Sequence, residues 1–216
     1  MTFIDVGANV GQYTPLASRA VGAGGRVIAF EPHPVVHRVL CRNIRRARCR
    51  NVVAEKMALG RTASLEPLYP GIPETLGGTS LRPWANTDRA RPVTIPVTSL
   101  DLYASRHGIT VDVMKVDVEG AELLVLEGGA ASLARSPRAT LIIEFFEERA
   151  RLFGHSVFDI AQYLHTRGFT LHTLTSSGLR AYEASDGLQR CVNVIATRTP
   201  ESLVGRHPAP AVATKH

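Results

Sequence analysis

Cysteine and long apolar runs are both scarce in this sequence, and each shortage argues against a class of protein. The three cysteines, Cys41, Cys49 and Cys191, form no CxxC pair, which speaks against a disulfide framework and against a cysteine-based zinc site. No stretch approaches the roughly 20 apolar residues that a membrane span needs. The first residues also lack the basic segment and apolar core of a signal peptide. We therefore expect a cytoplasmic protein that does not use a membrane.

Positive charge is in excess. The 216 residues carry a net charge of +6, and the pI is near 9.6. Much of this charge lies in one run of arginines: Arg38, Arg42, Arg45, Arg46, Arg48 and Arg50. The first four would share one face of a helix. A solvated helix face is the interpretation we favour, and a patch for an anionic ligand is the alternative.

Short β-branched runs alternate with segments of helical periodicity, as in an α/β protein with a largely parallel sheet. Parallel strands are expected at residues 3–6, 26–31, 52–57, 113–117 and 140–145, and closing antiparallel strands at 169–174 and 191–197. Helices are expected from residue 14, from residue 34, at 120–128 and at 157–167. Thr14 before Pro15 is a typical N-cap and first-turn pair for the first of these helices.

The region 66–92 interrupts this alternation. It is rich in proline and glycine and contains the only tryptophan, Trp84. Long irregular segments in compact domains are commonly functional lids or linkers, so we expect a flap at 70–92 that lies over a binding site. The residues from Pro200 onward are typical of a disordered tail. The prediction is one domain at 1–199 and a tail at 200–216.

A glycine turn follows the first expected strand directly. Asp5, Gly7, Asn9 and Gly11 form the pattern D-x-G-x-x-x-G, whereas the dinucleotide fingerprint G-x-G-x-x-G would need glycine where Asn9 stands. Open α/β sheets bind ligands beyond the carboxyl ends of their strands. An acid at such a turn could hold a cationic group, such as the amino group of an amino acid.

Glu31 ends the second expected strand, and its carboxylate offers two acceptor oxygens for the two hydroxyls of a ribose. A ligand with both a ribose and an α-amino acid points to S-adenosylmethionine. A tight turn plus a surface acid is the bland alternative. We favour the cofactor because both features occur in the right order on the right elements.

The sequence contains a second signature besides the glycine turn, "VDVMKVDVEGAELLVLEGG" at 111–129. It also contains the segments "FIDVGANVGQYT", "AFEPHP", "VTSLDLY" and "LIIEFFEE". With these segments the sequence resembles the FkbM family of S-adenosylmethionine-dependent methyltransferases over residues 3–197. The resemblance implies a doubly wound, Rossmann-like class I fold: a seven-stranded, mostly parallel sheet with an antiparallel last strand and helices on both faces. It also implies methyl transfer, usually to a hydroxyl oxygen of a sugar or secondary metabolite.

The resemblance assigns roles to particular positions. It places the turn, with Asp5, Gly7, Ala8, Asn9 and Gly11, at the methionine end of the cofactor, and Glu31 at the ribose. Met57 and Ala58 would flank the adenine, and Asp117 would lie close to the transferred methyl. Family members usually carry residues before the first strand that help to cover the site, whereas this sequence begins almost on that strand. A homo-oligomer, in which a second subunit supplies that cover, stays open.

Several carboxylates are expected to meet at the carboxyl edge of the sheet. Lys115 and Asp117 alternate on a strand and so share a face, Glu119 follows at the turn, and Glu144 lies on the neighbouring strand. Glu122, three residues after Glu119, would share a helix face with it. The candidates for the base that takes a hydroxyl proton are Asp117, Glu119, Glu144 and His155, and we favour Asp117 first and Glu119 second. For His155 we prefer a helix cap or a surface position.

Three alternatives stay in view. A divalent metal held by Asp117, Glu119 and Glu144 is the rival means of activating a hydroxyl, and we do not favour it because no dense acidic motif is present. A nucleic-acid methyltransferase would suit the basic charge. Base-modifying enzymes, however, need an Asn/Asp-Pro-Pro-aromatic turn where this sequence has Asp117-Val-Glu-Gly. A non-catalytic cofactor-binding or scaffold protein is the third. We expect a small-molecule acceptor.

Overall fold

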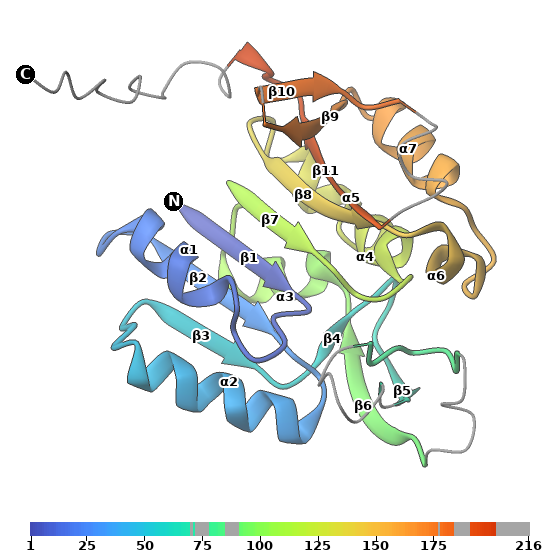
Figure 1. Cartoon of the computed structure of the whole chain (residues 1–216). Coiled ribbons are helices and arrows are strands. Elements are labelled where there is room, and N and C mark those ends of the chain that lie inside the picture. Colours follow the sequence, from blue (N-terminus) through green and yellow to red (C-terminus); the bar gives the residue numbers. More distant parts are fainter. Residues whose placement is uncertain (70, 72–77, 85–90, 177, 184–190, 202–216) are drawn as a thin grey trace, which may run out of the picture.

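The computed structural model describes residues 1–201 except 70, 72–77, 85–90, 177 and 184–190. The expected disordered tail lies almost entirely outside the described residues, as does much of the expected flap at 70–92. Figure 1 shows a central twisted sheet with helices on both faces and a small second sheet beside it.

The central sheet has eight strands in the order β10-β9-β11-β8-β7-β1-β2-β3. Their bounds are β1 Thr2–Val6, β2 Arg26–Phe30, β3 Val52–Glu55, β7 Val113–Val116, β8 Thr140–Phe145, β9 Thr170–Thr175, β10 Gly178–Ala181 and β11 Val192–Thr197. The five strands from β8 to β3 pair in parallel, whereas β11 runs antiparallel to both β8 and β9. The doubly wound sheet with an antiparallel last strand is therefore confirmed, and the strand number is corrected from seven to eight. The added strand is β10, which pairs with β9.

Helices α1 (Thr14–Val21) and α2 (Pro34–Arg46) lie on one face of this sheet. Helices α3 (Leu100–His107), α4 (Glu122–Gly128), α5 (Ala130–Ala134) and α7 (Val157–His165) lie on the other, and α6 (Glu147–Arg151) follows β8 (Figure 1). The larger core fills the second face, where Ile4, Phe30 and Met114 are fully buried. A smaller core, around Leu40 and Ile44, anchors α2. Each helix is thus held by one apolar stripe, as amphipathic packing requires.

The first helix begins differently from the prediction. Its N-cap is Tyr13, and Thr14 is already helical, so the expected N-cap role of Thr14 is wrong. The reason is a competing hydrogen bond: the Thr14 hydroxyl donates to Asp5 Oδ2 at 2.6 Å and is fully buried. Thr14 therefore ties α1 to the end of β1. The second helix begins at Pro34, as predicted, with His33 as its cap.

The region expected to be irregular is partly ordered. Strands β4 (Ala58–Leu59), β5 (Ser64–Leu68) and β6 (Val93–Thr98) form a three-stranded sheet in the order β4-β6-β5. Residues 66–68 thus belong to a strand, which corrects the start of the expected irregular segment. Beyond it, Tyr69 and Ser80 form an isolated antiparallel bridge. This second sheet brings Leu59 and Leu68 to the carboxyl edge of the central sheet.

The turn after β1 needs glycine at position 7. Gly7 has φ +80, and a Cβ there would lie 1.9 Å from the Asp117 carbonyl oxygen. Gly22 has a similar φ of +71, but a Cβ would meet nothing within 4 Å. The Gly7–Asp117 contact lies between the two loops of the site. A comparison of alanine substitutions at Gly7 and Gly22 therefore separates the cost of backbone strain from the cost of a steric clash.

We expect Gly22→Ala to destabilise the protein by about 1–3 kcal/mol through backbone strain alone, because φ 71 with ψ −179 is a region that only glycine adopts readily. Gly7→Ala should add an overpacking cost of about 1–3 kcal/mol. Urea unfolding of both variants measures the difference. Equal stabilities would show that the close approach of the two loops does not constrain the fold.

Candidate active site

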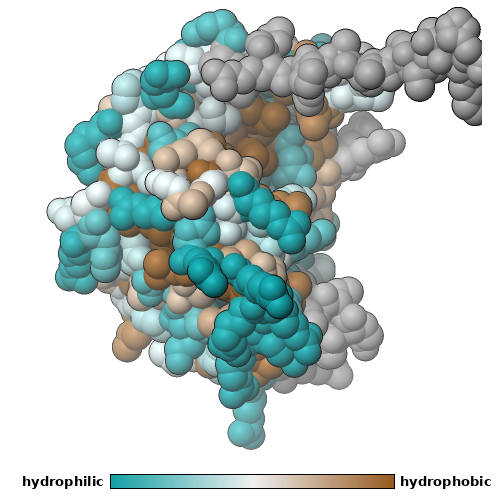
Figure 2. Space-filling view, turned by 90° about the vertical axis from the view of Figure 1, so that its left-hand side faces the viewer, coloured by the Kyte–Doolittle hydropathy of each residue, from teal (hydrophilic) through white to brown (hydrophobic). Residues whose placement is uncertain are grey.

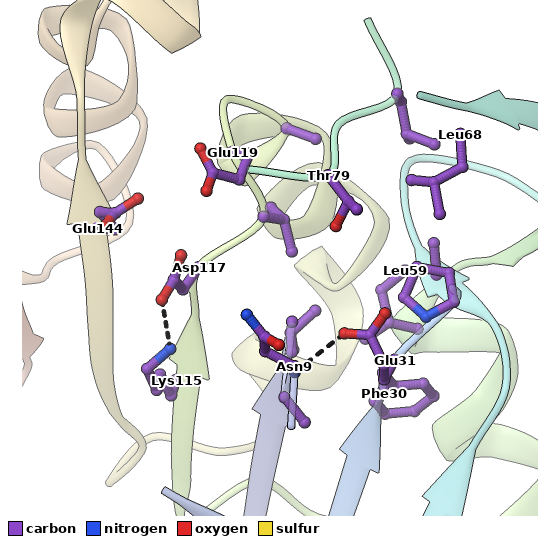
Figure 3. A pocket seen from close by; sticks show the side chains of 18 of the residues that line it. Asn9, Phe30, Glu31, Leu59, Leu68, Thr79, Lys115, Asp117, Glu119 and Glu144 are labelled. Atoms are coloured by element: carbon purple, nitrogen blue, oxygen red, sulfur yellow. Dashed lines mark hydrogen bonds and ion pairs between the residues drawn. The ribbon is translucent and has the colours of Figure 1, made fainter. Parts of the chain in front are cut away.

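A pocket of about 200 Å³ opens where β1, β2 and β7 end. This edge is the point where the chain crosses from one side of β1 to the other, and it is where open α/β sheets place their ligands. Figure 3 shows Asn9 and Glu31 toward one end and the carboxylates of Asp117, Glu119 and Glu144 toward the other. The pocket therefore has two chemically different ends.

Asn9 lies in the turn over β1 and is held in a strained backbone conformation, with φ 51. Its backbone N–H donates to Glu31 Oε2 at 2.9 Å. Its side-chain Oδ1 is buried and accepts no hydrogen bond from the described residues. Buried acceptors are almost always satisfied, so this oxygen is an unmatched polar atom in a residue that lines the pocket.

Not every predicted residue of the turn lines the pocket. Gly7, Ala8 and Asn9 do, whereas Asp5 and Gly11 lie outside its lining. Asp5 is fully buried beneath the turn, and burial raises the pKa of its carboxyl. Gly11 packs against Leu40. In this structure Asp5 supports the turn from below, through its hydrogen bond with Thr14.

Glu31 follows β2 and lines the pocket with only 3% of its surface exposed. The backbone N–H of Asn9 donates to Oε2 and that of His33 donates to Oε1, each at 2.9 Å. Each carboxylate oxygen keeps a second lone pair for a ligand hydroxyl. Desolvation raises the pKa of Glu31 to about 7, while the two backbone donors oppose that rise.

An apolar wall completes this end of the pocket. Phe30, Ala58, Leu59, Leu68 and Leu81 contribute to it. Of the two residues expected at the adenine, Ala58 lines the pocket, whereas Met57 lies outside the lining and packs against the central core. The sequence reasoning missed Leu59 and Leu68, because their position depends on the second sheet.

Two of the three acidic residues at the other end have a cationic partner. Asp117 Oδ2 pairs with Lys115 Nζ at 2.7 Å, as their shared strand face predicts. Glu119 Oε2 pairs with Arg149 Nη2 at 3.2 Å. Burial raises the pKa of Glu119, and Arg149 opposes that rise. Both carboxylates are therefore balanced by a nearby charge.

Glu144 differs from these two carboxylates. Its hydrogen-bond donor is the Cys191 thiol, at 2.9 Å from Oε1, and no ion pair in the described part of the chain includes it. Burial and the neighbouring Asp117 charge raise the pKa of Glu144 to about 7, while the Cys191 hydrogen bond opposes the rise. Such a pKa suits a group that accepts a proton near neutral pH.

Arg149 is the main residue of this end that the sequence reasoning missed. It is 3% exposed, and its guanidinium stacks on the Trp84 ring with 3.1 Å between Cζ and the ring centroid. The Trp84 indole donates to the Gly78 carbonyl, and the Ser80 hydroxyl donates to the Glu119 carbonyl. Arg149 therefore joins Glu119 to residues 78–84. No local sequence pattern links these positions.

Glu122 does not share a helix face with Glu119, which corrects that prediction. Glu119 precedes the helix and has φ 56. Glu122 is 3% exposed, and its Oε1 accepts the N–H groups of Val118 and Gly120. It therefore shapes the loop that carries Glu119. Burial raises the pKa of Glu122 to about 8.

This pKa predicts a pH-dependent stability. Between the ordinary pKa of 4.5 and about 8, the folded chain keeps a proton that the unfolded chain loses, so the free energy of unfolding falls as pH rises through this window. Glu122→Gln is neutral at every pH and keeps the acceptor oxygen. We expect its melting temperature to exceed that of the wild type by several degrees at pH 8 and to match it near pH 5. A gap that does not change with pH would contradict a protonated Glu122.

His155 is neither a helix cap nor a surface residue. It is 7% exposed and lies beside the Phe153 ring, and Ser156 provides the cap of α7. It also lies outside the pocket lining. Burial lowers its pKa. These positions leave the carboxylates as the candidate bases.

Two kinds of feature are absent from the described residues. No three histidine, cysteine, aspartate or glutamate side chains there lie close enough to hold a metal ion together. Within the same residues, no helix is both long and apolar enough to cross a membrane.

Comparisons with known proteins agree with the fold. A curated protein of Beauveria bassiana (strain ARSEF 2860), Methyltransferase 1, is 30% identical over 145 residues, which are 58% of this chain and 57% of the relative. The crystal structure of methyltransferase FkbM from Methylobacillus flagellatus KT superposes with a TM-score of 0.58 at 16% identity, over 91% of this chain and 43% of that chain. A SAM-dependent methyltransferase from Aquifex aeolicus gives 0.50 at 16% identity, over 91% and 81% of the two chains.

This chain therefore spans a little more than half of the curated relative and less than half of the Methylobacillus chain. The family model of the methyltransferase FkbM domain matches residues 5–171, which include the glycine turn, Glu31 and the carboxylates of Asp117, Glu119 and Glu144. The chain belongs to the FkbM methyltransferase family.

Proposed function

We propose that this chain is an S-adenosylmethionine-dependent O-methyltransferase that acts on a hydroxyl group of a small molecule, a sugar or secondary metabolite. The proposal rests on the pocket, whose two ends carry different chemical groups. Glu31 and Asn9 offer acceptors for a ribose and an amino group at one end, and Glu144 offers a proton acceptor at the other.

The residues present fit this cofactor. The unpartnered Asn9 Oδ1 matches an ammonium or hydroxyl donor. The carboxylate of Glu31 would accept the two ribose hydroxyls, and Ala58, Leu59 and Phe30 offer an apolar surface for the adenine. Gly7 keeps the turn free of a Cβ where the two loops meet. When bound, the cofactor supplies an electrophilic methyl group.

The chain's own part in the reaction is to orient the acceptor and to take its proton. Glu144 accepts the hydroxyl proton on its carboxylate as the oxygen attacks. Asp117, held by Lys115, keeps a fixed negative charge beside it, and Glu119, held by Arg149, lines the same end. Positioning the nucleophile can lower the barrier by up to about 7–11 kcal/mol in ideal cases. Asp117 and Glu119 thus become positioning groups, and Glu144 the base.

A turnover assay tests the proposal. Purified chain, S-adenosylmethionine and a panel of sugar and polyketide alcohols are incubated, and S-adenosylhomocysteine and methylated product are both quantified. We expect both products in equal amounts, and we expect a chelator to leave the rate intact because Glu144 serves as the base. Loss of turnover with chelator and its return with magnesium would favour the metal mechanism. Cofactor binding without product from any alcohol would favour a non-catalytic role.

A further inference from the structure

The segment from Val6 to Ala54 is almost free of acidic residues. Between Val6 and Ala54 the only acid is Glu31, which lies in the pocket. The same stretch holds eight arginines: Arg19, Arg26, Arg38, Arg42, Arg45, Arg46, Arg48 and Arg50. A charged surface normally mixes both signs. Apart from Glu31, this segment therefore has no acidic side chain that could neutralise its positive charge.

The fold exposes all eight of these arginines. They lie on α1, on α2, at the start of β2 and on the loop before β3, and no ion pair in the described part of the chain includes any of them. Figure 2 views this side of the molecule, and its lower part, where α2 lies in Figure 1, is largely hydrophilic. The positive charge is thus both exposed and uncompensated.

The arginines of α2 form a stripe opposite its buried face. Val36, Leu40 and Ile44 face the sheet, so Arg38 and Arg42 point to solvent. Arg38, Arg42 and Arg46 repeat at i, i+4, i+8, which spans about 12 Å of helix. Like charges at this spacing repel each other and destabilise a helix. A solvated face would need only polar residues, not three cations in register.

Two further features make this surface unfavourable for the isolated chain. The first turn of α2 has no acidic residue to offset the charge of the stripe. Arg48 adopts φ 56, a conformation that favours glycine or asparagine. Local rules are broken at functional sites more often than elsewhere. The stripe therefore calls for a partner that relieves its charge.

We propose that an acidic protein surface docks on the stripe formed by Val35, Arg38, Arg42, Arg45 and Arg46. Val35 is 48% exposed on the same helix face, and protein interfaces combine apolar contacts with arginine. A nucleic acid is disfavoured because Asn43 and Asn51 are engaged with backbone carbonyls, and α2 has no phenylalanine, tyrosine or tryptophan to stack on bases.

The stripe begins beside the pocket. Pro34 follows His33, whose backbone N–H holds Glu31, so a partner on α2 would lie next to the pocket rim. The inference goes beyond the proposed function and does not depend on it, because both of its tests measure properties of the chain without cofactor or acceptor.

The first test measures the thermal stability of Arg38→Gln/Arg42→Gln. Glutamine and arginine have similar helix propensities, so the substitution removes the repulsion and little else. We expect the melting temperature to rise by about 1–3 °C. The control, Arg91→Gln/Arg138→Gln, makes the same charge change on exposed residues outside helices and should leave it unchanged. A lower melting temperature for the α2 variant would overturn the argument that the stripe is unfavourable.

The second test compares three anionic probes at matched ionic strength. They are a helical peptide of about 20 residues that presents glutamate and leucine on one face, a single-stranded RNA and phosphatidylserine vesicles. We expect the peptide to bind most tightly, with affinity about tenfold weaker for the α2 variant and nearly unchanged for the control. Val35→Ser should also weaken it. Tighter binding of RNA or vesicles, or equal losses in both variants, would overturn the proposal.

Discussion

Glu144→Gln should lower kcat by about 10²–10⁴, the usual contribution of a positioned base, and leave the affinity for S-adenosylmethionine nearly intact. The reason is that Glu144 has a pKa of about 7 and a neutral thiol as its partner, whereas Asp117 and Glu119 are each held by a cation. Steady-state kinetics and calorimetry on the same preparation measure both quantities. Glu148→Gln, an exposed acid on the next helix, is the matched control. A Glu144→Gln enzyme with more than a tenth of the wild-type kcat would remove Glu144 from the base role.

The pH profile gives a second readout of the same role. Because the base must be ionised, activity should rise through a pH near 7 and level off above it. Asp117 raises the pKa of Glu144 and the Cys191 hydrogen bond lowers it. Asp117→Asn should therefore shift the profile toward lower pH, besides reducing the rate, and Cys191→Ala should shift it toward higher pH. Shifts in the same direction would contradict the assignment.

Glu31→Ala should weaken the binding of S-adenosylmethionine by about 100-fold or more, since hydrogen bonds to a charged group contribute about 1.5–3 kcal/mol each. The two carboxylate oxygens would each accept one ribose hydroxyl. Titration calorimetry measures the loss. Glu55→Gln is the control, because Glu55 ends the neighbouring strand, bonds to Tyr103 and lies outside the pocket lining.

The same carboxyl predicts a pH dependence of binding. Burial raises the pKa of Glu31 to about 7 in the free chain, and ribose hydroxyls prefer the ionised form as acceptor. Affinity should therefore rise as pH increases from 6 to 8 and then level off. Wild-type affinity that stays constant over this range would contradict ribose binding by Glu31.

Sequence reasoning was most successful where one strand or turn carries its own signal. The β8 strand was predicted with its observed bounds, because a β-branched run has clear ends. Lys115 and Asp117 were placed on one face by alternation alone, and they form an ion pair. The two ends of the pocket also follow from strand order, because parallel strands bring their carboxyl ends to one edge.

It was least successful where two distant segments decide a residue's surroundings. Sequence reasoning did not predict that Asp5 is fully buried beneath the turn, where the Thr14 hydroxyl turns inward to meet it. The strand β5, which contains Pro67, gave no clear signal since proline weakens a strand pattern. Arg149 and Glu119 lie 30 positions apart in sequence and meet only through the fold. Of the two cationic partners that distinguish Asp117 and Glu119 from Glu144, the sequence thus indicated Lys115 but not Arg149.

A crystal structure of the chain with S-adenosylhomocysteine tests the central claim most directly. The account predicts one ligand per chain in the pocket beyond β1, β2 and β7. Its ribose hydroxyls would lie within hydrogen-bond distance of both Glu31 oxygens, and a donor would reach Asn9 Oδ1. A ligand bound elsewhere, or an empty pocket at saturating concentration, would contradict it.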